Sequence, residues 1–431
     1  MTATLAMAHD RPFAHRLDRP LKFDLVGVGP KRDPFPQFAA MRAAGPVIPV
    51  RLPVLGKVWL TTTHAATLAM VKDNALFVQE GRHAGKSGTA GMPWWMPRGL
   101  RLLANNMLQK DEPDHRRLRK LVDKAFAGRD ILAMRGRIEE LADRILDGFE
   151  GRGEVDLAGE FARRLPLEVI CDLLGLPESD RGAFSEWTTR ALAVRSALDL
   201  FRVMGAIDRL AAYLRRQIEA CRHSPRPGLI GDLVRDEEDG DRLSEDELLA
   251  MVFLLLIAGF ETTTHLIGAC LVALEQNPEQ KAFLFAEPAS RMERAVEELA
   301  RYASPVQSTK PRYVSRDTEF FGTRLHRGDL IMGLVASANC DPEAFDRPEE
   351  LRLDRFPNPH LVFSSGIHFC LGMQLARVET QCALGRLYAR FPNLEIPPPH
   401  KLQWTARLGV RGVTTLPTRL QPGAATRLAA E

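Results

Sequence analysis

The chain has 431 residues, an apolar fraction of 45% and a formal net charge of +3. This length allows a large buried core, and so small a charge excludes a strongly basic nucleic-acid-binding protein. Met1–Asp10 lacks the apolar stretch of a secretory signal, and the longest apolar run, Leu248–Phe260, is shorter than a membrane span and meets Glu261. We therefore expect a cytoplasmic monomer that binds neither nucleic acid nor membrane.

The pattern of apolar residues predicts one mainly α-helical domain over residues 21–420, with small β-sheets. Residues 1–20 and 421–431 are expected to be flexible termini. In chain order, the clearest predicted elements are strands at Val47–Val50 and Val58–Thr61, helices at Arg137–Phe149 and Phe161–Leu174, and further strands around Leu325–Leu334.

The longest predicted helix begins at a capping box, Ser244–Glu247, in which Ser244 is the N-cap and Glu247 the third helical residue. It should continue to about Gln276, because Asn277-Pro278 stops it. Leu248–Ile257 is apolar nearly all round, so this half should be buried on every side.

Midway along that helix, Ala258–Thr264 reads AGFETTT. Glycine and successive threonines are poor helix formers, and a buried Glu261 must be paired or neutral. One interpretation is a kink whose hydroxyl groups bond within the helix. The other is a groove in which a small ligand rests on the backbone beside an acid and an alcohol.

Phe363–Gly372 presents one cysteine, Cys370, between two glycines and just before a helical pattern that runs from Leu371 to about Phe391. A thiol at a helix N-terminus is favoured as thiolate, which can be a nucleophile, a zinc ligand or an axial ligand of haem iron. The chain has six cysteines and no C-x-x-C pair, so a structural zinc site is not expected.

Together these motifs resemble those of cytochromes P450. Phe363–Gly372 is similar to the family's cysteine-ligand loop, although Ser364 stands where the family usually has glycine. Ala258–Thr263 is similar to the oxygen-activating helix motif, with Glu261 as the acid and Thr262 as the alcohol. Further similar segments follow the family's order over roughly residues 20–420: Asp111–Arg119, Glu298–Arg301 (E-x-x-R), Pro311-Arg312, Phe345–Pro348 with Arg355, Arg411–Val413 and Leu416-Pro417.

The resemblance implies a cytochrome P450 fold with haem b between the long central helix and the cysteine-loop helix. It makes Cys370 the axial ligand of the iron, Glu261 and Thr262 catalytic, and Glu298, Arg301 and Arg355 structural. The residues that it assigns to cofactor binding are His115, Arg119, Ala258, Gly259, Arg312, Phe363, Gly366, His368, Cys370 and Gly372.

The activity so implied is that of a haem-thiolate monooxygenase, which activates O₂ with two electrons and hydroxylates or epoxidises its substrate. Because Cys370 lies near the end of the sequence, we expect electrons from NAD(P)H to arrive through a separate ferredoxin and its reductase. A predicted basic face would dock this ferredoxin: Arg116, Arg117, Arg119, Lys120 and Lys124.

A small, mostly apolar substrate is expected from the residues predicted to surround it. These are Trp94, Trp95, Met96, Leu254, Ala258, Thr262, Val306, Gln307 and Leu408.

Three other functions are considered. A peroxygenase of the same fold would use H₂O₂, but such relatives usually lack the acid–alcohol pair. A haem-binding sensor would need neither proton delivery nor a substrate lid. A zinc protein would have to use Cys370 and His368, whose spacing suits zinc poorly.

Overall fold

The computed structural model describes residues 20–90, 105–127, 131–192, 199–236 and 243–421. The predictions for Trp94, Trp95, Met96 and nearly all of both termini lie outside these ranges. The helices are α1 Val28–Arg32, α2 Phe35–Ala44, α3 His64–Lys72, α5 Asp114–Ala127, α6 Arg135–Asp147, α7 Arg164–Leu174, α8 Arg181–Leu192, α9 Asp199–His223, α10 Leu229–Asp236, α11 Glu245–Gln276, α12 Pro278–Ala286, α13 Pro288–Ala303, α14 Val335–Ala338 and α15 Met373–Arg390.

A five-stranded sheet has the order β1-β2-β8-β5-β3, with β2 and β8 parallel and the other neighbours antiparallel. Three two-stranded sheets pair β9 with β10, β4 with β11 and β6 with β7. The strands are β1 Val47–Leu52, β2 Gly56–Thr61, β3 Phe77–Val78, β4 Glu154–Asp156, β5 Arg312–Val314, β6 Thr318–Phe320, β7 Thr323–Leu325, β8 Leu330–Gly333, β9 Gln403–Trp404, β10 Val413–Thr415 and β11 Pro417–Arg419. The prediction of a mainly helical protein with small sheets is confirmed.

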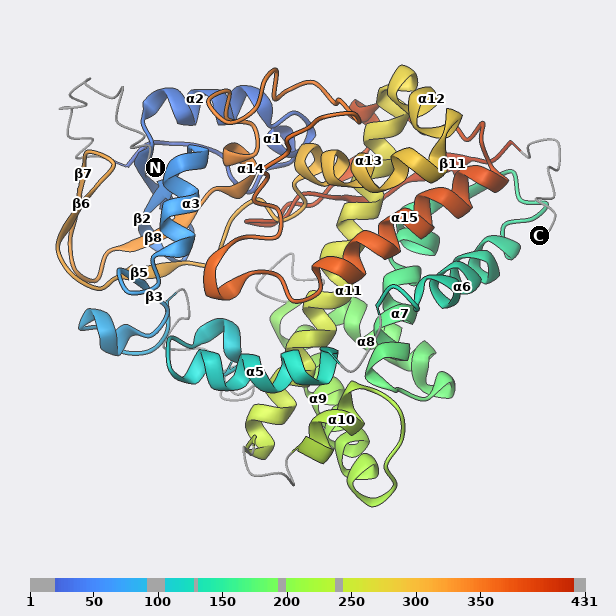
Figure 1. Ribbon diagram of the computed structural model, residues 1–431, viewed down its shortest axis with the longest axis horizontal. Coiled ribbons are helices and arrows are strands. Elements are labelled where there is room, and N and C mark those ends of the chain that lie inside the picture. The colour runs from blue at the N-terminus through green and yellow to red at the C-terminus, as the bar shows by residue number, and fades with distance from the viewer. Residues whose placement is uncertain (1–19, 91–104, 128–130, 193–198, 237–242, 422–431) are drawn as a thin grey trace, which may run out of the picture.

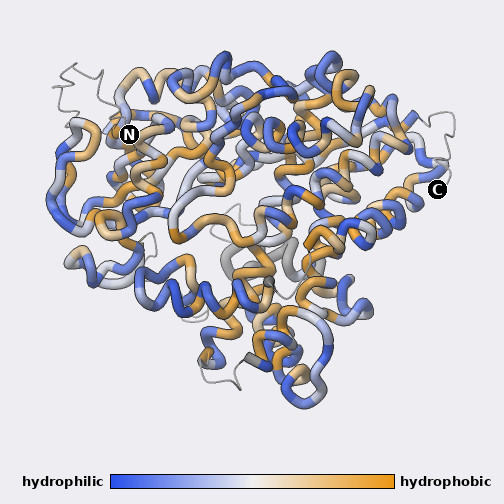
Figure 2. The backbone as a smooth tube through the Cα atoms, in the orientation of Figure 1, coloured by the Kyte–Doolittle hydropathy of each residue, from blue (hydrophilic) through white to orange (hydrophobic). Residues whose placement is uncertain are grey.

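Helix α11 passes through the middle of the molecule, with the five-stranded sheet on one side and α6 and α7 on the other (Figure 1). It begins at the predicted capping box, in which both reciprocal hydrogen bonds between Ser244 and Glu247 are present. The helix packs against α7, α9, α13 and α15. Apolar segments gather in this interior, whereas hydrophilic segments lie mostly on outer helices and loops (Figure 2).

By length and composition alone α11 could cross a membrane. However, 61% of its apolar window is buried inside the protein, as expected for the core helix of a globular fold. Its length therefore reflects its central place in the core.

Candidate active site

The cysteine loop is closed by its own backbone. The N–H of Cys370 donates to the carbonyl of Phe363 at 3.0 Å, and the N–H of Phe369 donates to Gly366 at 3.1 Å. Helix α15 then starts at Met373, two residues later than predicted. Burial raises the pKa of the Cys370 thiol, whereas an N–H of Gly372 and the guanidinium of Arg119 oppose the rise.

Two residues in the loop have left-handed backbone. At Gly366, φ is +72°, and a Cβ there would lie 2.6 Å from the carbonyl oxygen of Val71, so only glycine fits against α3. At Ser364, φ is +60°, where a non-glycine residue is strained. Gly372 has φ −85° and open space around its Cβ position, so no turn or close approach requires glycine there.

The thiol of Cys370 is accessible, although the surrounding protein is dense enough to shift its pKa. Helices α15 and α11 pack against each other, and in Figure 1 the start of α15 is drawn next to the middle of α11. In the middle of α11, Ala258 is exposed and Leu254 and Thr262 are partly accessible; the three are spaced four residues apart and so share one face. An accessible thiol and an accessible helix face inside the protein are what a large flat cofactor between them requires.

The acid and the alcohol of α11 have different partners. The Thr262 hydroxyl donates to the Ala258 carbonyl at 2.9 Å, one turn earlier. The Glu261 carboxylate forms an ion pair with Arg407, its Oε1 lying 2.5 Å from Nη2. Burial is the main reason why the pKa of His265, one turn after Glu261, falls to about 4. Sequence reasoning missed His265 and Arg407, of which His265 could have been found from its i+4 spacing to Glu261.

Gly259 has a role in helix packing. A Cβ there would lie 2.8 Å from Cδ1 of Ile170, so this glycine lets α7 approach α11 closely. The more accessible small residue is its neighbour Ala258, and Gly259 as a cofactor contact stays a prediction.

Four of the predicted cofactor-binding side chains, two histidines and two arginines, lie near one another. The rings of His115 and His368 stack edge to face with centroids 4.5 Å apart. Arg119 donates to the carbonyl of Phe369 at 2.8 Å, and Arg312 is buried. Burial and the charges of Arg312, His115 and Lys310 lower the pKa of His368 strongly.

Several hydrogen-bond donors on these histidine rings and on the Arg312 guanidinium have few acceptors or none. Within the described ranges, Nε2 of His115 and Nδ1 of His368 have no hydrogen-bond partner, whereas Nδ1 of His115 lies 3.5 Å from Oε1 of Glu112. Burial lowers the pKa of Arg312 to about 10, and the only hydrogen bond of its guanidinium among the described residues is 3.4 Å long, to Val71. Unpaired buried donors and cations of this kind fit the two propionates of a haem.

Glu298, Arg301 and Arg355 meet in a fully enclosed network. Glu298 accepts from Nε of Arg301 at 2.7 Å and from Nε of Arg355 at 3.0 Å. It also accepts from the N–H of Arg352 and the amide of Asn358. Helix α13 thereby holds the segment that leads into the cysteine loop.

The neighbouring Glu297 holds the loop from another side. It pairs with Arg377 of α15 at 2.6 Å, and the Arg377 guanidinium lies over the Phe363 ring at 5.1 Å. Burial alone would raise the pKa of Glu297, but the hydrogen bonds from His360 and Arg377 lower it to about 2. Phe363 is thus fixed by its ring as well as by its carbonyl.

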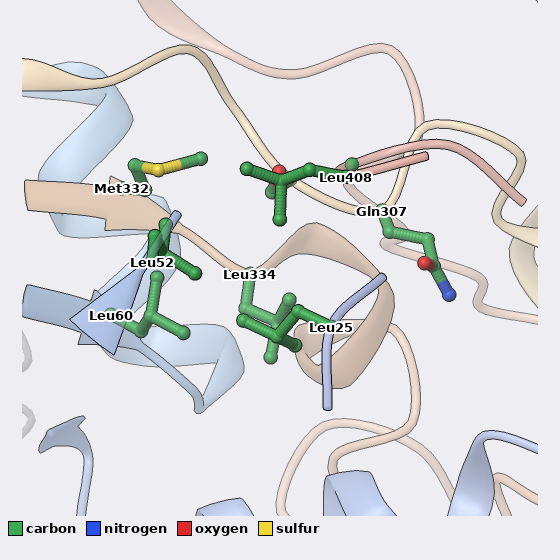
Figure 3. A pocket seen from close by; sticks show the side chains of 9 residues that line it. Leu25, Leu52, Leu60, Gln307, Met332, Leu334 and Leu408 are labelled. Atoms are coloured by element: carbon green, nitrogen blue, oxygen red, sulfur yellow. The ribbon is translucent and has the colours of Figure 1, made fainter. Parts of the chain in front are cut away.

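The predicted substrate-lining residues do not all meet. Gln307 and Leu408 line a small apolar pocket between the N-terminal segment and the five-stranded sheet, with Leu25, Leu52, Leu60, Met332 and Leu334 (Figure 3). No residue of α11 lines this pocket. Gln307 turns its amide away from the leucines, where it accepts a hydrogen bond from the buried Lys31. Val306 forms a β-bridge with Val410.

Comparison with known proteins agrees with this geometry. The cytochrome P450 family model matches residues 198–419. The chain is 38% identical over 363 residues to the polyketide biosynthesis cytochrome P450 PksS of Bacillus subtilis, which covers 84% of this chain and 89% of the relative. The chain belongs to the cytochrome P450 family. It is also 38% identical to the vitamin D(3) 25-hydroxylase of Pseudonocardia autotrophica, covering 91% of this chain and 95% of that one.

Solved structures of this family share the whole fold. The structure of PksS has a TM-score of 0.84 at 36% identity and covers 93% of this chain and 100% of its own. That of the myxobacterial CYP267B1 in complex with myristic acid also has a TM-score of 0.84, at 33% identity, and covers 93% and 99%. The protein is therefore a P450 monooxygenase, an oxidoreductase of a family that uses haem and O₂.

Proposed function

We propose that this protein hydroxylates or epoxidises a small, mostly apolar molecule, with electrons that a separate redox partner delivers from NAD(P)H. The observation that carries the proposal is the accessible thiol of Cys370 beside the accessible face of α11. Haem bound there supplies an iron centre that activates O₂. Cys370 would hold the iron, and His115, Arg119, Arg312 and His368 the propionates.

Thr262 would act as a hydrogen-bond acceptor. Its hydroxyl hydrogen is directed to the Ala258 carbonyl, so the lone pairs of Oγ1 are left for a protonated ligand on the accessible face of α11. Glu261 would move protons from solvent at Oε1. Because Oε1 is bonded to Arg407, this ion pair must open, or Arg407 must swing outward, before a proton can be taken up there.

The substrate is proposed to be apolar because the accessible face of α11 begins with Leu254 and Ala258. Two relatives point the same way, since one is named as a vitamin D(3) hydroxylase and the structure of another holds myristic acid. Both molecules are mostly hydrocarbon.

The test uses the purified holoprotein and two variants. We expect it to be red, and the reduced protein with CO should give the Soret band typical of thiolate-ligated haem. Thr262→Ala should release more peroxide per reductant consumed, whereas Thr263→Ala is the control because that hydroxyl donates to Gly259 and is buried. A colourless protein containing zinc would refute the proposal, and equal peroxide release from both variants would remove the role of Thr262.

Ferredoxin is the proposed partner, and Arg116 and Lys120 are the residues that we propose it contacts. Arg116 and Lys120 are exposed on α5, whereas Arg117 pairs with Glu247 of α11, and Arg119 turns inward to the cysteine loop. An acidic partner on this face would lie directly outside the loop that carries Cys370. We propose that the protein acts in the cytoplasm, where such partners are found.

Reversing both exposed charges, with Arg116→Glu and Lys120→Glu, should slow reduction by ferredoxin and weaken its dependence on salt. The control reverses Arg51 and Lys57, which lie opposite each other on β1 and β2 and are also exposed. If both double variants are reduced at the same rate and with the same salt dependence, α5 is not the docking face.

A further inference from the structure

Lys310 lies two residues before Arg312, the first residue of β5, and no role is assigned to it above. Its side chain is exposed, yet burial by surrounding protein lowers the pKa of Lys310 to about 8. Cys370 shows the same combination of an accessible side chain and a pKa shifted by burial. The side chain of Lys310 is thus accessible, although protein surrounds it closely.

The ammonium of Lys310 has no hydrogen bond or ion pair among the residues that the structure describes. Burial is the sole cause of its lowered pKa, so no described carboxylate lies close enough to act on it. A lysine held in an enclosed place is costly unless an anion pairs with it. No described residue supplies an anion to the Lys310 ammonium, so a ligand from outside the protein can supply one.

The direction of Lys310 follows from the local sequence. Pro311 favours extended backbone at the residue before it, and side chains two residues apart in an extended chain lie on the same side. Lys310 thus shares a side with Arg312. The charges of both act on His368, which stacks on His115, so Lys310 lies near these two histidines and Arg312.

We propose that Lys310 binds a carboxylate at the edge of the haem site, an inference that rests on the proposed function. Two molecules can bring a carboxylate there. One is the haem itself, through a propionate, and the other is a substrate with an apolar chain and an acidic end, such as a fatty acid. An ammonium–carboxylate hydrogen bond in an enclosed place serves either molecule.

The experiment uses the holoprotein, the variants Lys310→Met and Lys310→Arg, and the control Lys401→Met, which removes an exposed lysine. The first measurement is the Kd for dodecanoic acid and the Kd for 1-dodecanol, each determined from the change that binding causes in the haem spectrum. The second is the rate at which haem transfers to apomyoglobin. Loss of one charge-assisted hydrogen bond should change the affected quantity about 10-fold or more.

A substrate carboxylate is supported if Lys310→Met weakens binding of dodecanoic acid but not of 1-dodecanol. A propionate is supported if Lys310→Met speeds haem transfer and Lys310→Arg restores the slow rate. The proposal is overturned if Lys310→Met matches Lys401→Met in both measurements, including the case in which dodecanoic acid does not bind at all. Failure of the proposed function would appear separately, as a missing thiolate-type CO spectrum in the unmodified protein.

Discussion

Replacing Glu298 by Gln should destabilise the protein through the charges that it leaves behind. Glu298 is the only carboxylate among the described residues that pairs with the buried Arg301 and Arg355, and it is fully buried itself. Gln keeps the shape but offers one acceptor oxygen, and it directs an NH₂ group toward a guanidinium. Two buried cations would then lack a counter-ion.

Breaking a buried ion pair from one side costs about 3–5 kcal/mol. Carbonyl groups of Asn339 and Pro348 also accept from Arg301, so we expect the lower half of this range. At about 2.1 cal/mol/K per residue, a 431-residue protein has an unfolding entropy of about 0.9 kcal/mol/K, so Tm should fall by about 3–5 °C.

Thermal and urea unfolding, followed by circular dichroism, measure the loss, and Glu293→Gln is the control because Glu293 is exposed on the same helix. Hydrogen exchange at the Cys370 N–H, which bonds Phe363, should be faster in Glu298→Gln, because Glu298 holds the segment leading to this loop. If Glu298→Gln unfolds within 0.5 kcal/mol of the control, the network does not hold the loop and the reasoning is refuted.

Two further changes test the loop from other sides. The folded-state pKa of Glu297 is about 2, below its ordinary value of 4.5, so its contribution is complete above pH 4.5 and is lost as pH falls toward 2. Glu297→Gln should therefore remove about 3 kcal/mol of stability at pH 7 and much less at pH 3. The urea midpoints of the variant and the unmodified protein should then converge as pH falls. A difference between the midpoints that is the same at both pH values would contradict the assigned cause. Ser364→Gly should raise stability by about 1 kcal/mol, because φ is +60° there, and an unchanged or lower urea midpoint would show that Ser364 is not strained.

The sequence predicted best what short-range chemistry decides. The capping box at Ser244 and the stop at Asn277 bound α11 as expected, because both depend on neighbouring residues only. Strands β1, β2 and β8 could be placed for the same reason, from short apolar runs near turn residues, whereas β3 and β5 were not predicted in this way. The family's E-x-x-R pattern pointed to Glu298 and Arg301 meeting Arg355 before any contact was known.

Long-range contacts could not be read in this way. The partner of Glu261 is Arg407, far along the chain and in no motif. Gly259 appeared to open a groove, but the space beside it is filled by Ile170 of another helix, which only the packing of α7 on α11 reveals. Lys310 likewise reads as an ordinary surface lysine, since its sequence neighbours do not show how closely the folded protein surrounds it.

These long-range contacts give the two ends of the site different chemistry. At the α11 end, Glu261 is paired with a cation from this chain, so the acid is available only when Arg407 leaves it. At the β5 end, neither Lys310 nor Arg312 has an ion pair or hydrogen bond to a carboxylate among the described residues, although the charge of Asp111 acts on Arg312, so a ligand can supply the anion. A substrate that is apolar along its length and acidic at one end would satisfy Lys310 without disturbing the Glu261–Arg407 pair. A basic substrate would compete with Arg407 for Glu261, and we expect the protein to reject it.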